Sequence, residues 1–248
     1  SLPNGLSEDG RFLVVSRSFG NPQFELAVVD IGSRRAATFL LRPDLQPFES
    51  FTGDSFQFSE DGSLVSYRGG GADFAPVPGG NSQQIYVSSN PFFADALPQG
   101  IVGGSGAALT GVVSDDGRYV AFESTASGLD PGVADNNGAS DVFVLDRDSG
   151  QLRLASTVVG SPGQARGGQQ PALAGDGTRV AFSAVTASSG RLDILVRNLG
   201  TQQQTSLATV LGGNAATADL GAPSLSVDGS LLAFVASGAS LLAADGDA

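Results

Sequence analysis

The chain has 248 residues, among them 35 glycines and 12 prolines, and its formal net charge is −12. This charge disfavours nucleic acid and anionic membrane surfaces as partners. The sequence contains no histidine, cysteine or lysine, which excludes serine–histidine and cysteine–histidine catalysis, Schiff-base chemistry, disulfides and histidine- or thiolate-bound zinc. No apolar run approaches the roughly 20 residues that span a bilayer, so we expect no membrane insertion.

One turn motif recurs five times along the chain, as SEDGR, SEDGS, SDDGR, AGDGT and SVDGS. The steps between successive copies are 52, 55, 60 and 52 residues, measured at the turn glycines Gly10, Gly62, Gly117, Gly177 and Gly229. Five positions after the glycine stand Val15, Tyr67, Phe122, Phe182 and Phe234, and we expect the four aromatic side chains to be buried between neighbouring blades. A period near 50 residues, with several strands per unit, predicts a β-propeller.

The third copy shows how one unit is built. Asp-Gly tolerates the positive φ of a tight hairpin turn, so it joins the strands LTGVVS (109–114) and RYVAFES (118–124). The second of these has no polar alternation, which indicates burial on both faces. A third strand, DVFVLD (141–146), and an outer strand, QLRLAST (151–157), complete the unit. We therefore expect four strands per blade.

The other copies supply matching strands. The third strands are ELAVVD (25–30), QIYVSS (84–89) and DILVRN (193–198), and a further outer strand is QTSLAT (204–209). The pattern Ser-x-Asp-Gly-[Arg/Ser]-x-Val-Ala-Phe followed by Asp-[Val/Ile]-x-Val resembles the TolB-like propeller repeat over nearly the whole chain, although no copy has a proline before Asp-Gly. The resemblance implies an all-β propeller of four-stranded blades in a bacterial exported protein, whether periplasmic, secreted or at the cell surface.

Residues 1–248 are expected to form a single β-propeller domain or a fragment of a larger propeller, with four complete repeats and half of a fifth. The fifth copy stops before its third strand is due, so we expect a piece of a longer protein. Its second strand, SLLAFVAS (230–237), would then expose an apolar edge. We expect the N-terminal segment or a neighbouring chain to pair with it, the latter by self-association.

One segment carries a candidate metal site. In DNNGASD (135–141), the carboxylates of Asp135 and Asp141, with Asn137 between them, offer the hard oxygen ligands that suit Ca²⁺. The spacing does not match an EF-hand loop. The alternative, which we favour, is an Asn-Gly turn leading into a strand that begins with Asp141.

The composition leaves carboxylates as the main chemical groups, and most of them stand in turns or at strand ends. We therefore expect no enzyme activity, no catalytic residue and no cofactor beyond Ca²⁺. The predicted function is non-catalytic binding of a protein or a glycan through loops at one face of the propeller or around its central channel. An accessory propeller of a larger exported enzyme or surface protein is the alternative, and a carboxylate-based glycosidase is the third reading.

Overall fold

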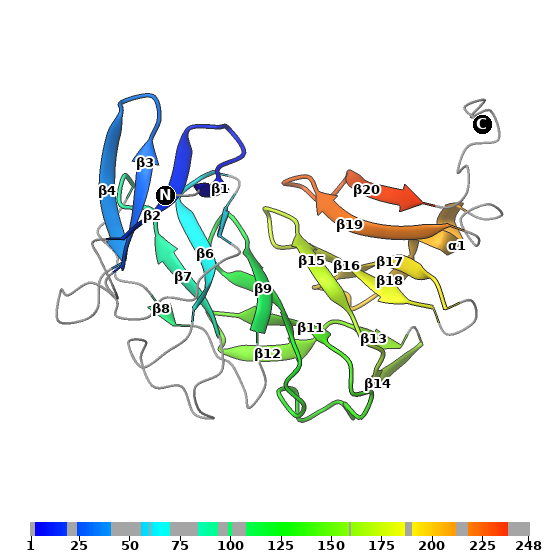
Figure 1. The fold of residues 1–248 in the computed structure, drawn as a ribbon. Coiled ribbons are helices and arrows are strands. Elements are labelled where there is room, and N and C mark those ends of the chain that lie inside the picture. The colour runs from blue at the N-terminus through cyan, green and yellow to red at the C-terminus, as the bar shows by residue number, and fades with distance from the viewer. Residues whose placement is uncertain are drawn as a thin grey trace, which may run out of the picture.

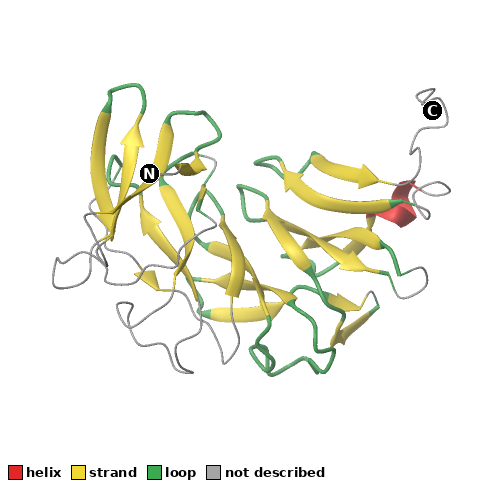
Figure 2. Ribbon diagram, viewed as in Figure 1, coloured by secondary structure: helices red, strands yellow, loops and turns green. Residues whose placement is uncertain are grey.

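The sheets of this protein follow one another around a common axis (Figure 1). The computed structural model describes residues 3–18, 24–40, 56–59, 61–69, 84–93, 99–100, 108–158, 160–186, 190–211 and 218–237. Within these ranges the regular structure is β-strand, apart from one short helix (Figure 2). Four sheets have four antiparallel strands each, a fifth has two, and a small hairpin lies between the third and fourth of the large sheets.

Each four-stranded sheet is an antiparallel meander, which we call a blade. Blade 1 contains β1 (Pro3–Leu6), β2 (Phe12–Ser18), β3 (Phe24–Asp30) and β4 (Arg35–Leu40). Blade 2 contains β5 (Gln57–Phe58), β6 (Leu64–Gly69), β7 (Gln84–Ser89) and β8 (Gln99–Gly100). In both, the Asp-Gly turn joins the first strand to the second, as expected.

Blade 3 contains β9 (Ala108–Val113), β10 (Tyr119–Ser124), β11 (Asp141–Asp146) and β12 (Gln151–Leu154), and the hairpin β13 (Thr157–Val158) and β14 (Ser161–Ala165) follows it. Blade 4 contains β15 (Gln169–Leu173), β16 (Arg179–Val185), β17 (Leu192–Asn198) and β18 (Gln204–Ser206), with the helix α1 (Leu207–Leu211) directly after it. The fifth unit contains β19 (Asp219–Leu225) and β20 (Leu232–Ser237). The expected all-β propeller with four-stranded blades is confirmed.

The first strands of the units lie innermost. Each of them contacts the first strand of the next unit, in the order β1, β5, β9, β15 and β19. The second and third strands of blades 2, 3 and 4 pack against the first strand of the following unit. The axis of the molecule is therefore surrounded by strand edges, and the core lies between neighbouring blades.

The Ser-x-Asp-Gly turns share one hydrogen-bond pattern. In the third copy, Ser114 Oγ donates to Asp116 Oδ1 (2.6 Å) and accepts from the Tyr119 amide (2.9 Å). The Arg118 amide donates to Asp116 Oδ1 (2.9 Å). The same bonds recur in the copies that begin with Ser7, Ser59 and Ser226. The turn glycines have φ between 62° and 72°, a conformation that favours glycine.

The turn glycines also lie against the preceding blade. A Cβ atom on Gly117 would lie 2.7 Å from Leu64 Cδ1, and one on Gly177 would overlap the ring of Tyr119. Leu64 and Tyr119 each stand two positions after the turn glycine of their own blade. The same relation holds for the pairs Gly62–Phe12 and Gly229–Arg179. A hydrogen atom in place of a side chain thus lets successive hairpins stack closely.

The aromatic residues five positions after the turn glycine fill the blade interiors. Tyr67, Phe122 and Phe182 are each at most 1% exposed, which confirms the expectation for these three. Phe234 is only half-buried, against the same expectation, although it packs on the cluster that holds Ile194 and Leu220. The physical reason is that, in the described part of the chain, no blade follows the fifth unit to cover its outer face.

The outer strand of blade 4 is shorter than expected. QTSLAT (204–209) was predicted as a strand, but the strand ends at Ser206 and the chain continues as α1. Ser206 Oγ accepts a hydrogen bond from the Thr209 amide (3.1 Å) and donates one to Asp193 Oδ2 (2.6 Å). Ser206 therefore caps a helical turn where a strand was expected.

Among the described residues, no helix has the length and apolar character that crossing a membrane requires.

The edge of the fifth unit is not covered by the N-terminal segment. β1 pairs with β2 inside blade 1, so the expected pairing of this segment with β20 is wrong. Among the described strands, β20 pairs with β19 alone. Its unit exposes Leu231 and Val235, at 71% and 62%. Pairing with a neighbouring chain stays a prediction.

The close approach at the turn glycines predicts unequal costs for one substitution. Gly10→Ala and Gly177→Ala place the same methyl group in the same turn at φ of 69° and 67°. Gly10 has open space around it, so the variant loses about 1 kcal/mol through backbone strain alone. Gly177→Ala must also displace the Tyr119 ring and loses about 1–3 kcal/mol more. Urea unfolding measures both free energies, and equal losses would contradict the packing role of Gly177.

Removing the serine hydroxyl from one turn and adding it to another should change stability in opposite directions. Ser114→Ala removes the hydrogen bonds of a buried hydroxyl with Asp116 and the Tyr119 amide, and is expected to lower the free energy of unfolding by about 1 kcal/mol. The fourth copy has Ala174 at this position, where Asp176 Oδ1 accepts only from the amide and hydroxyl of Thr178. Ala174→Ser supplies the missing hydroxyl and is expected to raise stability by up to about 1 kcal/mol. If the urea concentration at the unfolding midpoint is the same for Ser114→Ala and for wild type, the hydroxyl has no role in stability.

Candidate functional site

A pocket lies around the axis at the end of the blades that carries the Asp-Gly turns. Its volume is about 280 Å³. Residues from all five units form its wall: Glu8, Gln57, Phe58, Val112, Val113, Asp115, Pro171, Ala172, Leu173, Gly175, Pro223, Ser224 and Leu225. We call it the central pocket. It is the place where the inner strands bring all units together, as the expected binding around the central channel requires.

The rim of the central pocket is acidic. Glu8 and Asp115 stand in the first and third turns, directly beside the turn aspartates Asp9 and Asp116. Hydrogen bonds from the Ser7 hydroxyl and the Arg11 amide lower the pKa of Asp9. In the fifth copy, bonds from the Ser230 amide and the Ser226 hydroxyl lower the pKa of Asp228 to about 2. These turn carboxylates therefore stay ionised well into the acidic range, and the negative charge at this end persists.

Two prolines line the central pocket at the same place in their units. Pro171 and Pro223 each stand six positions before the turn glycine, in the inner strands β15 and β19. Proline has no amide hydrogen, so these strand edges offer fewer donors toward the axis than other residues would. In the sequence the signal for these residues is their equal distance from the turn glycine, but only two units share it, and the third copy has Gly111 at this position.

The residues before these prolines have unusual backbone angles. Gln170 and Ala222 have φ of 54° and 49°, each at a bulge in its inner strand. Gln170 Oε1 accepts hydrogen bonds from Ser183 Oγ (3.1 Å) and the Ala222 amide (3.2 Å). The main-chain amide of Gln170 donates to Glu123 Oε2 (3.1 Å) in blade 3. Gln170 thus links blade 3, blade 4 and the fifth unit at the bulge.

The structure brings the three predicted metal ligands close together. Asp141 begins β11 and is fully buried, and Asn137 Nδ2 donates to its Oδ2 (2.9 Å). Asn137 Oδ1 accepts from the Ala139 amide (2.7 Å), and Gly138 has φ of 67°, which forms the expected Asn-Gly turn. Asp135 lies near enough for its charge to interact with that of Asp141. The amide of Asn137 therefore presents its nitrogen to Asp141 and uses its oxygen in the turn.

Asp141 has a structural role that recurs in blade 4. Ser156 Oγ (2.5 Å) and the Gly167 amide (3.0 Å) donate to Asp141 Oδ1. Asp193, at the corresponding position of β17, accepts from Ser206 Oγ (2.6 Å) and the Ala208 amide (2.9 Å). In both blades this aspartate ties the third strand to the segment that follows the outer strand.

The environment of Asp135 opposes its negative charge. Burial raises its pKa first, and the neighbouring charge of Asp141 raises it further. In the part of the chain that the structure describes, no three acidic side chains lie close enough together to hold a metal ion. The candidate site thus offers two carboxylates, one of which already accepts three hydrogen bonds.

No family model and no curated protein matches the sequence. Solved structures match its fold. TolB from Acinetobacter baumannii has a TM-score of 0.55 at 16% identity, and the match covers 93% of this chain and 47% of that one. The chain thus spans about half the length of that TolB structure.

Two peptidase structures match in the same way. The β-propeller domain of the Trilobed protease from Pyrococcus furiosus has a TM-score of 0.57 at 10% identity, covering 91% of this chain and 62% of that one. The Pyrococcus horikoshii acylaminoacyl peptidase has a TM-score of 0.54 at 12% identity, covering 91% and 34%. At these identities the likeness concerns the fold alone. The chain has a TolB-like β-propeller fold.

Proposed function

We propose that this protein is a non-catalytic binding module whose central pocket receives part of a protein partner. The observation that carries the proposal is the convergence of five units on one pocket of about 280 Å³. Such a pocket is too small to enclose a domain but large enough for one or two side chains. A partner would therefore insert a short segment and rest its remaining surface on the surrounding turns.

The negative charge at the rim of the central pocket favours a partner segment that is positively charged. Glu8 and Asp115 lie in the pocket wall, and hydrogen bonds lower the pKa of the turn carboxylates Asp9 and Asp228. Opposite charge across an interface speeds association and excludes wrong partners. We infer that the inserted segment carries an arginine or a lysine. A neutral glycan, the other partner class considered, gains nothing from this charge.

The second candidate function is an accessory propeller within a larger exported enzyme or surface protein. The two peptidase structures favour it, because one is described as a propeller domain and this chain spans only 34% of the other. In this reading the central pocket faces a second domain of the same protein. The exported location rests on the likeness to TolB and is part of the proposal.

Charge at the rim predicts the behaviour of simple probes. A tri-arginine peptide should bind the chain, whereas triglutamate should not. Glu8→Gln should weaken tri-arginine binding about threefold to fivefold, the effect of one nearby charge in a largely aqueous setting. Asp148→Asn is the matched control, since this carboxylate is 74% exposed in the outer turn between β11 and β12. Isothermal titration calorimetry at low ionic strength measures the binding of each peptide to the wild-type chain and to both variants.

The competing outcomes are distinct. Equal losses in Glu8→Gln and Asp148→Asn would mean that the peptide responds to net charge and not to the central pocket. Binding of chitotriose, unaffected by Glu8→Gln and without any binding of tri-arginine, would replace the protein partner by a glycan.

The calcium site stays a prediction that Asp135→Asn tests. Because the pKa of Asp135 is raised in the folded chain, its ionised form destabilises the fold at neutral pH. This cost vanishes below the ordinary value of 3.8, where the carboxyl is protonated in both folded and unfolded chains. Without calcium, Asp135→Asn should therefore melt higher than wild type at pH 7 and equally at pH 3.

Calcium itself should reverse this order. If Asp135, Asn137 and Asp141 bind the ion, millimolar Ca²⁺ should raise the melting temperature of wild type but not that of Asp135→Asn. Calorimetric titration of the metal-stripped chain gives a second readout. No heat and no thermal shift in wild type would leave this segment as a turn only.

A further inference from the structure

A buried arginine stands where blade 3 has a leucine. Aligning β17 with β11 on Asp193 and Asp141 places Arg197 opposite Leu145. Leu145 is 6% exposed and belongs to the apolar core between blades 2 and 3. Arg197 is equally buried, at 6%, and reaches the segment that follows blade 3. A guanidinium group thus occupies a position that holds Val29 in blade 1, Ser88 in blade 2 and Leu145 in blade 3.

All hydrogen-bond partners of Arg197 are uncharged. Its Nη1 donates to the carbonyl oxygens of Ala155 (2.9 Å) and Leu154 (3.4 Å) and to Thr157 Oγ1 (2.8 Å). Its Nη2 donates to Gln202 Oε1 (2.9 Å). Within the described residues, no carboxylate lies within ion-pair distance of this guanidinium. Its positive charge is solvated by dipoles and left without a counter-charge.

Burial and two neighbouring charges act on the pKa of Arg197. Burial lowers the pKa of Arg197 most, the charge of Arg153 lowers it further, and Asp130 acts in the opposite direction. The carboxylate of Asp130 is engaged by the amides of Gly132 (3.0 Å) and Leu154 (2.9 Å). A buried charge without a partner is costly, so an anion from outside would be stabilised here.

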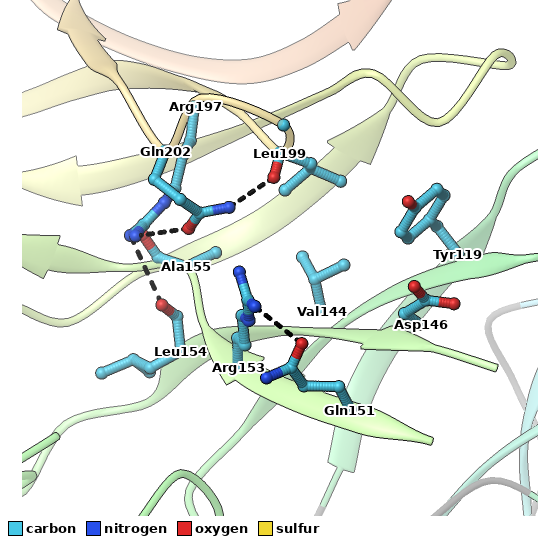
Figure 3. Close-up of a pocket in the computed structure, with 11 residues that line it drawn as sticks. Tyr119, Val144, Asp146, Gln151, Arg153, Leu154, Ala155, Arg197, Leu199 and Gln202 are labelled. Atoms are coloured by element: carbon cyan, nitrogen blue, oxygen red, sulfur yellow. Dashed lines mark hydrogen bonds between the residues drawn. The ribbon is translucent and has the colours of Figure 1, made fainter. Parts of the chain in front are cut away.

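Arg197 and Arg153 line one pocket of about 270 Å³ between blades 3 and 4. Figure 3 shows Arg153 projecting from β12 between Val144 and the Arg197 guanidinium. The one hydrogen bond that Arg153 makes to a described side chain goes to Gln151 Oε1 (2.6 Å). At the other side of the pocket, Asp146 is already paired with Arg118 Nη2 (2.9 Å). We call this cavity the arginine pocket.

Apolar side chains share the rest of the wall with the polar side chains of Asp146, Gln151 and Gln202. Val144, Leu154 and Leu199 contribute aliphatic side chains, and Tyr119 contributes an aromatic ring. Two guanidinium groups suit a carboxylate, which accepts charged N–H bonds from the donors that their present partners leave open. The aliphatic wall suits an apolar group attached to that carboxylate. The volume limits the ligand to about the size of one amino-acid residue.

We propose that the arginine pocket binds a carboxylate carrying a small apolar substituent, either a free acyl amino acid or the C-terminal residue of a peptide. The site is separate from the central pocket and does not depend on the proposed function. Arg197 and Arg153 hold the carboxylate, and the aliphatic wall of blades 3 and 4 holds the substituent.

The test compares acids with their neutral amides, using the 248-residue chain. N-acetyl-leucine should bind saturably in isothermal titration calorimetry, whereas N-acetyl-leucinamide should not. Ala-Ala-Leu with a free and with an amidated C-terminus distinguishes the peptide source from the free acid. Sodium sulfate at matched ionic strength tests for a simple anion site. Equal binding of acid and amide, or sulfate binding as tight as N-acetyl-leucine, would overturn the proposal.

Variants locate the binding. Arg197→Leu should abolish it while the chain stays folded, because Leu145 fills the equivalent position in blade 3. Arg153→Gln should weaken it about tenfold by removing charged hydrogen bonds. Arg35→Gln, an exposed arginine in blade 1, is the control and should bind as wild type. Unchanged binding in Arg197→Leu and Arg153→Gln would show that Arg197 serves only to tie blade 4 to the carbonyls after β12. If Arg197→Leu fails to fold, Arg153→Gln and the amide comparison decide the matter.

Discussion

The close contact between the turn glycines of the second to fifth units and the preceding blade is the constraint on which the rest of the structure depends. Two demands meet at each of these glycines, a positive φ for the hairpin and the absence of a side chain for stacking. Leu64 and Tyr119 fill the space that a Cβ atom would need at Gly117 and Gly177. The turn therefore sets both the path of the chain within a blade and the distance to the next blade.

Fixing the turns also fixes where charge gathers. The aspartate before each glycine must accept hydrogen bonds from the turn, so one carboxylate per unit stands at the same end of the axis. These bonds lower the pKa of Asp9 and Asp228, which keeps that end negative. The acidic rim of the central pocket is thus a consequence of repeating the turn, and Glu8 and Asp115 add to it. The turn aspartates thus both hold the hairpins together and make this end of the axis negative.

The parts of the fold that could be predicted are those that the repeat encodes locally. The period of the turn glycines placed every first hairpin, and the apolar runs placed the second and third strands, because hairpin geometry depends on few residues. Phe234 was expected to be buried like Phe122, but burial depends on the next unit and not on the strand itself. The helix after Ser206 depended on a long-range bond to Asp193, which a strand-like pattern does not reveal. The direction of the Asn137 amide likewise follows from the turn around it.

The candidate sites were less predictable because they lie where units differ. Pro171 takes the place of Gly111 beside the central pocket, and Arg197 takes the place of Leu145 between blades. A substitution of this kind is invisible in one unit read alone, since arginine near a strand end is ordinary. It becomes informative only against the other units, because a shared backbone position has a shared burial. Leu145 and Arg197 are equally buried, so the exchange places a charge where blade 3 has an apolar group. The neutral acceptors around Arg197 balance its hydrogen bonds but not its charge, and that imbalance is the physical basis for proposing it as a binding residue.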